Sequence, residues 1–226
     1  MLSQHDFVQT GLNLPNIHVL MQEIYAELQK EQQQRQLFYE TVDENKKMEF
    51  INGEIIFHSP VKKRHNLATN LLNILLSIYV NMRRIGFVGI EKILISLTRN
   101  DYEPDLVYFN TEKNQTLHLD QMRFPAPDLA VEVLSKSTEH TDRTTKMDDY
   151  AAHGITEYWI IDPDKQTIEQ YILNTETHTY DLQLKAAEGN IHSVAVSGFS
   201  IPIKAIFDTQ ANLETMNDII AKINKQ

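Results

Sequence analysis

Apolar residues recur every three or four positions in three parts of the chain, which predicts amphipathic helices over residues 17–37, 65–82 and 213–223. The stripe of the first helix leads into a polar EQQQRQ run. We therefore interpret this helix as a packing or dimerising appendage. A fourth helix is predicted over residues 141–153, where Gly154 provides a common C-terminal stop. No segment has the roughly 18–20 uninterrupted apolar residues of a membrane span, so no membrane partner is expected.

Short apolar segments between these helices indicate β-strands. The sequence MEFINGEIIF at 48–57 predicts a hairpin, because Asn-Gly is the strongest short-range hairpin signal. Further strands are predicted over 90–97, 102–109, 128–134, 157–162, 167–173, 178–184 and 191–196. The strand–helix–strand order over 128–162 requires a parallel region. The chain is therefore predicted to be an α/β protein, with a mixed β-sheet flanked by helices and with added β-hairpins and N- and C-terminal helices.

Composition narrows the classes of function mainly by exclusion. Of the 226 residues, 42% are hydrophobic and 23% are charged, as in ordinary globular proteins. The absence of cysteine excludes disulfides, thiolate nucleophiles and cysteine-ligated metals, and it fits a reducing compartment. The start of the chain, MLSQHDFVQTGLNLPN, lacks the basic and apolar regions of a signal peptide. A cytoplasmic location is therefore expected.

The charge pattern does not point to a nucleic acid by itself. The formal net charge is −10, which is unusual for a protein that binds polyanions. Basic residues nevertheless cluster at Lys62, Lys63 and Arg64, and again at Arg83 and Arg84. From charge alone, a solvated helix end is the favoured interpretation of these clusters.

Two carboxylates stand where burial is expected. Glu132 interrupts the apolar sequence LAVEVL, and Asp105 follows Pro104 at the start of another apolar strand. An ionised carboxylate in such a place is costly unless it is paired or bound to a cation. If adjacent strands bring the two carboxylates together, a divalent cation that prefers oxygen ligands, Mg²⁺ or Mn²⁺, relieves their repulsion.

Lys146 is the third candidate, because its predicted helix directly follows the strand of Glu132. The connecting sequence SKST is rich in helix-capping residues, so the helix can fold back across the strand end. Beside a metal, a lysine can orient an attacking water and stabilise charge on a phosphate. A structural interpretation stays open, in which Asp105 caps a turn and Glu132 forms a buried ion pair with Arg143 or Lys146.

Other known motifs of catalysis are absent from the sequence. Its nine histidines show no HExxH or comparable zinc spacing, and it has no GxSxG, GxxxxGK[ST] or GxGxxG segment. A metal-dependent hydrolytic site around the two carboxylates is thus the main chemical hypothesis.

Several longer segments extend this hypothesis. They are FINGEIIFHSP followed by a histidine, then YEPDLVYF, then PAPDLAVEVLSKST followed by DRTTKMDDYAAHGITEYWIIDP. In order and wording they closely resemble the Uma-type putative restriction endonuclease family, part of the PD-(D/E)XK phosphodiesterase superfamily. The resemblance implies a restriction-endonuclease-like nuclease domain over 38–208, with an N-terminal helical extension at 1–37 and a C-terminal helix at 209–226.

The resemblance also implies roles for individual residues. Asp105 matches the aspartate of the PD motif, and Glu132 matches the acidic residue of the third core strand. Leu134 stands where the superfamily has a lysine, and Lys146 in DRTTK matches the lysine that replaces it in the Uma-type pattern.

Glu54 and His65 fall on family-like positions as well, as an additional acidic group and a phosphate or metal neighbour. The implied reaction is Mg²⁺-dependent hydrolysis of DNA phosphodiester bonds, with Mn²⁺ as a possible substitute. Asp105 and Glu132 would hold the metal, with the carbonyl of Val133 as a further ligand, and Lys146 would position the water. The basic residues Lys62, Lys63, Arg64, Arg83 and Arg84 would contact the DNA backbone without reading its sequence.

Two other functions stay open at this point. A nuclease-fold protein that binds nucleic acid or a partner without cutting would fit the negative net charge and the lack of a base-reading module. A homodimer assembled through the helices at 17–37 and 211–224 is the third possibility.

Overall fold

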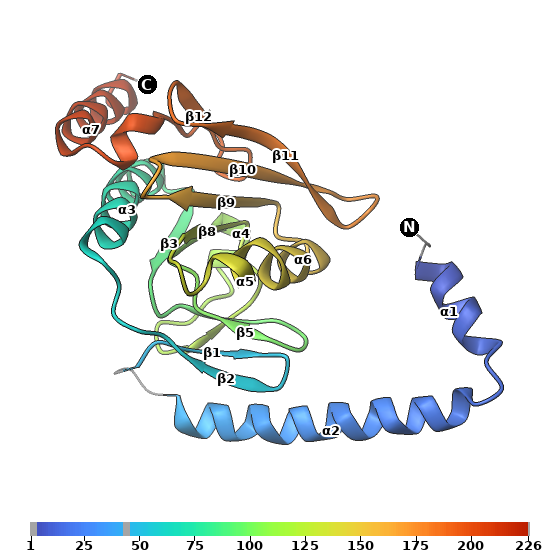
Figure 1. Cartoon of the computed structure of the whole chain (residues 1–226). Coiled ribbons are helices and arrows are strands. Elements are labelled where there is room, and N and C mark those ends of the chain that lie inside the picture. Colours follow the sequence, from blue (N-terminus) through green and yellow to red (C-terminus); the bar gives the residue numbers. More distant parts are fainter. Residues whose placement is uncertain (1–3, 43–45, 226) are drawn as a thin grey trace.

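The computed structural model describes residues 4–42 and 46–225 (Figure 1). Residues 1–3 of the predicted N-terminal extension and residue 226 of the predicted C-terminal helix lie outside the described residues. The helices are α1 (Gln4–Leu12), α2 (Ile17–Thr41), α3 (Lys63–Arg83), α4 (Thr111–Asn114), α5 (Glu139–Arg143), α6 (Thr145–Ala152) and α7 (Thr209–Ile223), with a 3-10 turn η1 (Ile203–Ile206). Among the residues described, none of these helices is long and apolar enough to cross a membrane.

A six-stranded sheet forms the centre of the molecule, with the strand order β11-β10-β9-β8-β6-β3. Its strands are β3 (Gly86–Ile90), β6 (Leu106–Asn110), β8 (Leu129–Val133), β9 (Glu157–Asp162), β10 (Thr167–Asn174) and β11 (Thr179–Ala186). Strands β8 and β9 are parallel, and all other neighbours in this sheet are antiparallel. The predicted parallel crossover and mixed sheet are therefore confirmed.

A second sheet has the order β2-β1-β5-β4-β7. It consists of β1 (Met48–Ile51), β2 (Glu54–Phe57), β4 (Leu94–Ser96), β5 (Asp101–Tyr102) and β7 (Arg123–Phe124). The predicted hairpin is present, and Asn52 and Gly53 at its turn both have positive φ, at 50° and 87°. A small ribbon of β12 (Asn190–His192) and β13 (Ser200–Pro202) completes the strands.

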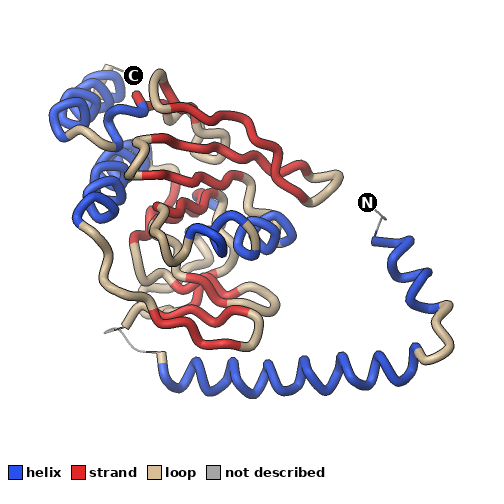
Figure 2. The backbone as a smooth tube through the Cα atoms, viewed as in Figure 1, coloured by secondary structure: helices blue, strands red, loops and turns tan. Residues whose placement is uncertain are grey.

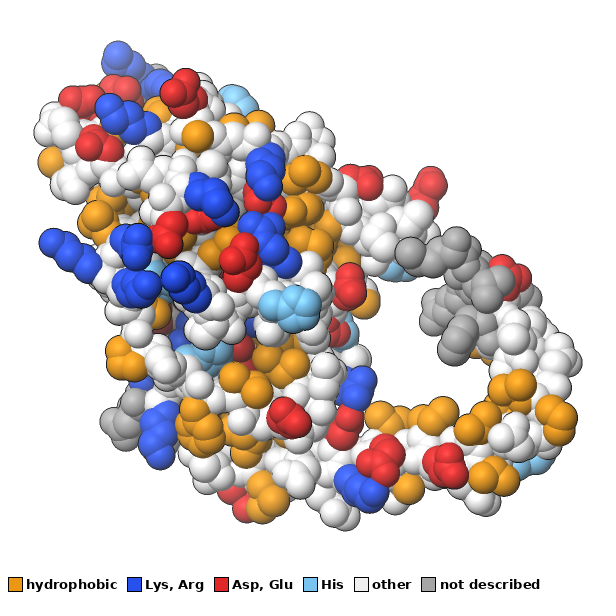
Figure 3. All heavy atoms as spheres, in the orientation of Figure 1, with side chains coloured by type: hydrophobic (Ala, Val, Ile, Leu, Met, Phe, Trp, Pro, Cys, Tyr) orange, Lys and Arg blue, Asp and Glu red, His pale blue; other side chains and the backbone are white. Residues whose placement is uncertain are grey.

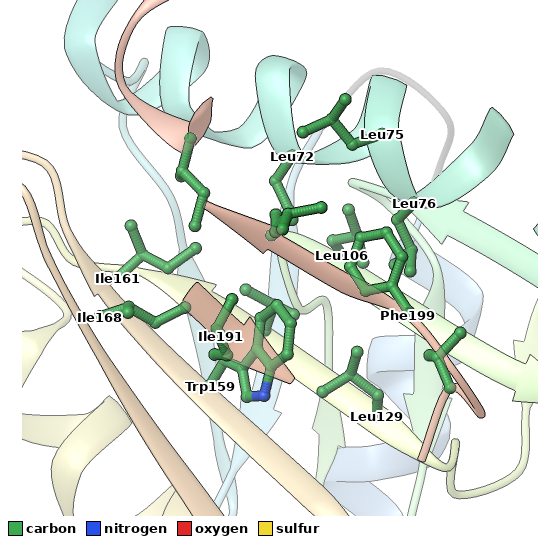
Figure 4. Close-up of a cluster of buried hydrophobic side chains, with 14 of the residues drawn as sticks. Leu72, Leu75, Leu76, Leu106, Leu129, Trp159, Ile161, Ile168, Ile191 and Phe199 are labelled. Atoms are coloured by element: carbon green, nitrogen blue, oxygen red, sulfur yellow. The ribbon is translucent and has the colours of Figure 1, made fainter. Parts of the chain in front are cut away.

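Alternation along β8 builds a core on each face of the central sheet. Leu129 and Val131 belong to the cluster that packs under α3 and α7 (Figure 4), whereas Ala130 belongs to the cluster that includes Tyr150 of α6. Successive side chains of a strand point to opposite faces. Glu132 therefore shares the face of Ala130, beneath α6.

The strand predicted over 90–97 is confirmed only at β4, Leu94–Ser96. Strand β3 ends at Ile90, a turn follows in which Glu91 and Lys92 have positive φ, and β4 begins only at Leu94. The actual β3 was missed because Gly86 and Gly89 weaken its strand pattern.

The strand predicted over 102–109 is also divided. Tyr102 ends β5 of the second sheet, while Leu106 begins β6 of the central sheet. Between them Pro104 lacks the N–H that a continuous strand would donate. The chain therefore crosses from one sheet to the other directly at Asp105.

Two more predicted elements need correction. The helix expected over 141–153 is two helices, because Thr144 has non-helical angles of φ −128° and ψ −89° between α5 and α6. The strand expected over 191–196 ends at His192. After it, the amides of Val194 and Ala195 donate to the buried carboxylate of Glu157 rather than to a neighbouring strand.

The N-terminal helices extend away from the rest of the molecule, as the tube in Figure 2 shows. The helix predicted over 17–37 continues to Thr41, and only its last turns join the core, where the fully buried Phe38 contacts Phe50. Much of the remaining apolar stripe, including Ile24 and Leu28, is exposed.

Candidate active site

The candidate site lies where the two sheets and two helices meet. Asp105 stands in the link between β5 and β6, Glu132 in β8, Lys146 in α6 and His65 in the first turn of α3. All four side chains are buried. The fold thus brings together four of the residues that the sequence singled out, from segments up to 81 positions apart.

Asp105 is held from three directions. Its Oδ2 atom accepts a hydrogen bond of 2.8 Å from the backbone N–H of Val133 and lies 3.2 Å from Nε2 of His65. Its Oδ1 atom accepts a 3.0 Å hydrogen bond from Nζ of Lys47, a residue that the sequence reasoning missed. Burial opposes ionisation of Asp105, but the hydrogen bond from His65 and the charge of Lys47 lower its pKa well below the usual range.

Lys146 is the centre of a second group of contacts. Its Nζ lies 2.9 Å from Oε1 of Glu49, 3.0 Å from Oε1 of Glu132 and 3.3 Å from Oδ1 of Asp142. The hydroxyl of Tyr150 donates to the same Oε1 of Glu132 at 3.0 Å. One ammonium group therefore faces three buried carboxylates.

Glu49 ties this group to the hairpin. Its Oε2 lies 2.9 Å from Nε2 of His58, and its Oε1 accepts a 2.9 Å hydrogen bond from the backbone N–H of Glu103. Although burial raises it, the charge of Lys146 and the contact with His58 lower the pKa of Glu49 to about 2. Sequence alternation could have identified Glu49, because it lies between the apolar Met48 and Phe50 just as Glu132 lies between valines.

The cluster contains more carboxyl groups than lysines: Lys47 and Lys146 face Asp105, Glu132, Glu49 and Asp142. Burial raises the pKa of Glu132 well above its usual value, and the nearby charges of Asp142 and Asp105 add to that rise, while Lys146 opposes it. Burial likewise raises the pKa of Asp142. Burial would lower the pKa of Lys146, but the surrounding carboxylates raise it far above normal, so this lysine stays protonated.

This imbalance fits an additional cation. Asp105, Glu132 and the neighbouring Glu49 and Asp142 offer only oxygen ligands, the type that Mg²⁺ and Mn²⁺ prefer. Among the described residues, no group of three or more His, Asp or Glu side chains is already arranged to hold a metal. Mg²⁺, however, is usually bound by one or two carboxylates together with water and substrate phosphates. Asp105 and Glu132 fit that pattern.

Other predicted site residues have different placements. Val133 contacts Asp105 through its N–H. Glu54 is exposed at the start of β2, and in the described part of the chain it makes no hydrogen bond or ion pair with the buried cluster. Arg143 was the alternative ion-pair partner expected for Glu132. It instead forms a bidentate ion pair with Glu169.

The predicted basic residues do not form one patch. Lys62, Lys63 and Arg64 lie at the beginning of α3, and Arg83 and Arg84 lie at its end. A 21-residue helix separates these groups by roughly 30 Å. On the face drawn in Figure 3, Lys and Arg side chains lie among Asp and Glu side chains. Of the predicted basic residues, Lys62 and Arg64 border the candidate site, where they line a depression together with His65.

Two depressions adjoin the buried cluster. The first, which we call the hairpin cleft, has about 550 Å³ and is lined by Glu49, Ile51, Asn52, Glu54, Ile56, Phe57, His58, Ser59, Ser137, Thr138, Thr141, Asp142, Thr145 and Lys146. The second, which we call the basic pocket, has about 470 Å³, and His65 and the basic residues Lys62, Arg64, Lys136 and Lys165 line it beside the acidic Glu139, Asp162 and Asp164. Arg64 and Lys165 pair with Asp164 and Asp162, so Lys62 and Lys136 give the pocket its positive character. Ser59 and Ser137 border both depressions. Glu49 and Asp142 of the buried cluster line the hairpin cleft. Asp105 and Glu132 line neither depression, but Lys146, the contact of Glu132, lines the cleft, and His65, the contact of Asp105, lines the basic pocket.

Comparison with known proteins identifies a family and a protein that are similar in sequence to this chain. A family model described as "Uma2: Putative restriction endonuclease" matches residues 31–204. A protein of Synechocystis sp., named "Uncharacterized protein sll1609", is 32% identical over 127 residues, which are 55% of this chain and 71% of that protein. These matches confirm the family resemblance found in the sequence.

The fold has a solved counterpart as well. The crystal structure of a putative nuclease belonging to DUF820 from Anabaena variabilis superimposes with a TM-score of 0.63. The two proteins share 21% sequence identity, and the similarity covers 75% of this chain and 94% of the other. The restriction-endonuclease-like fold predicted from the sequence is confirmed.

Proposed function

This chain belongs to the Uma2 family of putative restriction endonucleases, and from that premise we propose that it hydrolyses DNA phosphodiester bonds with the help of Mg²⁺ or Mn²⁺. The observation that supports this proposal is the buried cluster around strand β8. In it Lys146 contacts Glu132 of β8, and Asp105 accepts a hydrogen bond from Val133, the next residue of β8. An acidic pair with an adjacent lysine is suited to phosphoryl chemistry, because it combines ligands for a cation with a positive group for developing charge.

Asp105 and Glu132 would hold the cation in the proposed reaction. When bound, such a cation would lower the pKa of a water molecule and neutralise negative charge on the phosphate. His65 and the N–H of Val133 fix the orientation of the Asp105 carboxylate. Tyr150 and Lys146 do the same for Glu132, and Lys146 also supplies positive charge beside the phosphate.

The basic pocket would hold the DNA backbone next to the reacting phosphate. Lys62, Arg64 and Lys136 line it without belonging to the buried cluster. Contacts of this kind give affinity that falls with increasing salt and does not depend on base sequence. Arg83 and Arg84, at the far end of α3, are proposed to contribute little to this site.

Cleavage of plasmid and single-stranded circular DNA with Mg²⁺ or Mn²⁺ tests the proposal. We expect wild-type protein to cut, and we expect Glu132→Gln and Asp105→Asn to lose at least a hundredfold in rate. Glu188→Gln, an exposed carboxylate between β11 and β12, is the matched control and should cut like wild type. Equal cutting by the wild type and Glu132→Gln would exclude these residues from the mechanism.

A nucleic-acid-binding protein that does not cut is the second candidate. One observation favours it: Lys47 and Lys146 already pair with Asp105 and Glu132, so both carboxylates are compensated by protein groups. Calorimetric titration with Mn²⁺ separates the candidates. Binding of Mn²⁺ that is lost in both Asp105→Asn and Glu132→Gln supports the nuclease, and binding of DNA without any metal binding supports the alternative.

A further inference from the structure

The hairpin cleft differs in chemistry from the basic pocket beside it. Glu49, Glu54 and Asp142 line the cleft, and its one lysine, Lys146, is already surrounded by carboxylates. Apart from the scissile phosphate at the proposed cation, a phosphate would be repelled there. The basic pocket has the opposite balance, because its four lysines and arginines outnumber its acidic residues Glu139, Asp162 and Asp164. The part of a substrate that enters the hairpin cleft must therefore be uncharged.

The walls of the cleft suit a flat, partly apolar group with polar edges. The hairpin contributes Ile51, Ile56 and Phe57, and the side chain of Phe57 is 61% exposed. The segment from the end of β8 to α6 contributes the hydroxyl-bearing residues Ser137, Thr138, Thr141 and Thr145 to the same cleft. An aromatic side chain together with hydroxyl groups is a combination that can stack on a nucleobase and bond to its edges.

The size and position of the cleft agree with this assignment. Its volume of about 550 Å³ lies within the usual range of roughly 300–1,000 Å³ for small-molecule sites. It shares Glu49, Asp142 and Lys146 with the buried cluster and meets the basic pocket at Ser59 and Ser137. A base in the cleft would therefore lie beside Lys146, the direct contact of Glu132, and next to the proposed position of the scissile phosphate.

We propose that the hairpin cleft binds one unpaired base adjacent to the scissile phosphate, so that the substrate is single-stranded or locally unpaired DNA. A base inside a duplex has both faces stacked and its pairing edge occupied, so it cannot contact Phe57 without leaving the helix. This inference rests on the proposed function, since it places the base relative to the reacting phosphate.

Binding in the presence of a chelator tests the inference without cleavage. The probe is a short oligonucleotide that contains 2-aminopurine, used as a single strand and as a fully paired duplex. We expect wild-type protein to bind the single strand at least tenfold more tightly and to quench its fluorescence through stacking. Phe57→Ala should weaken single-strand binding about tenfold, Phe57→Tyr should restore it, and duplex binding should not change.

Leu119→Ala is the matched control, because Leu119 is a fully exposed apolar residue outside the hairpin cleft. It should bind like wild type. Equal affinity for single strand and duplex, no detectable binding, or single-strand binding that is indifferent to Phe57→Ala would each overturn the inference. If DNA is still cut in a Glu132-dependent manner, the proposed nuclease function survives that result. Selective single-strand binding without any cleavage would instead remove the nuclease and, with it, the position of the base beside a scissile phosphate.

Discussion

The ammonium group of Lys146 lies 3.0 Å from Oε1 of Glu132, inside the protein and shielded from water. The two residues belong to a helix and a strand that are separated in sequence by the loop and helix at 134–144. Such a pair is sensitive to the loss of either member, because the remaining charge has no solvent to stabilise it. Substitution of either residue therefore tests whether the buried ion pair of the site is present.

Replacement of Lys146 by Met should destabilise the protein by about 3–5 kcal/mol, because Glu49, Glu132 and Asp142 lose their shared cation. Urea unfolding followed by circular dichroism measures this change. Lys30→Met removes an exposed lysine that pairs with the exposed Glu27, and its unfolding midpoint should equal that of wild type. An unchanged midpoint for Lys146→Met would contradict the buried network.

Replacement of Lys47 by Met should tighten binding of Mn²⁺ roughly tenfold, about 1.4 kcal/mol. The Lys47 ammonium lies 3.0 Å from Oδ1 of Asp105 and so competes with a metal for that oxygen. Isothermal titration calorimetry gives the affinity directly. The neighbouring Lys46 is exposed, and Lys46→Met should bind Mn²⁺ like wild type. Weaker binding in Lys47→Met would show that Lys47 supports the metal site instead of opposing it.

Glu169 should make the protein sensitive to acid. Although burial opposes it, the hydrogen bonds from Arg143, Tyr171 and Lys185 lower the pKa of Glu169 from 4.5 to about 2. A lowered pKa in the folded state means that the carboxylate contributes stability above about pH 4.5, and that this contribution disappears as the pH falls toward 2. Thermal melting of Glu169→Gln should therefore depend less on pH across that window than melting of wild type. Parallel curves for the two proteins would contradict the assignment, and Glu188→Gln serves as the control.

Replacement of Gly86 by Ala should cost about 2 kcal/mol or more of stability. Gly86 has a φ of 150°, and an added Cβ would collide with the backbone carbonyl of Phe109 on the paired strand β6. Chemical unfolding measures the loss. Gly11→Ala, in a helix with open space around the glycine, should be neutral or slightly stabilising; equal midpoints for the two variants would argue against this packing of β3 on β6.

Local sequence predicted well those elements whose cause is local. The Asn52-Gly53 turn specifies its hairpin through two residues that adopt positive φ. Strands β8 and β9 are recognisable because both are largely apolar, as expected for buried parallel strands. The same reasoning failed at 90–97, where the apolar residues on either side of a turn at Glu91 and Lys92 belong to different sheets.

The candidate site shows a similar division. Asp105 and Glu132 were found because a carboxylate inside an apolar strand is a local anomaly. Lys146 was found because its predicted helix follows the strand of Glu132, and the family resemblance points to the same lysine. Lys47 has no comparable signal, since it lies in a polar segment, KK, ahead of β1. Its contact with Asp105 spans 58 positions, and no local pattern in either segment predicts that the two residues meet.

The sequence by itself determined that this protein has an α/β, nuclease-like fold and that its strands carry carboxylates whose burial is energetically unfavourable. Both features follow from short segments, because backbone preference and the penalty for burying a charge are local properties. Only the tertiary structure decided which cations compensate those carboxylates, which basic residues lie near them and that an acidic, aromatic cleft adjoins a basic pocket. These features depend on distances between side chains from separate sheets and helices. Such distances are set by packing of the whole chain, and they leave no periodic trace along it.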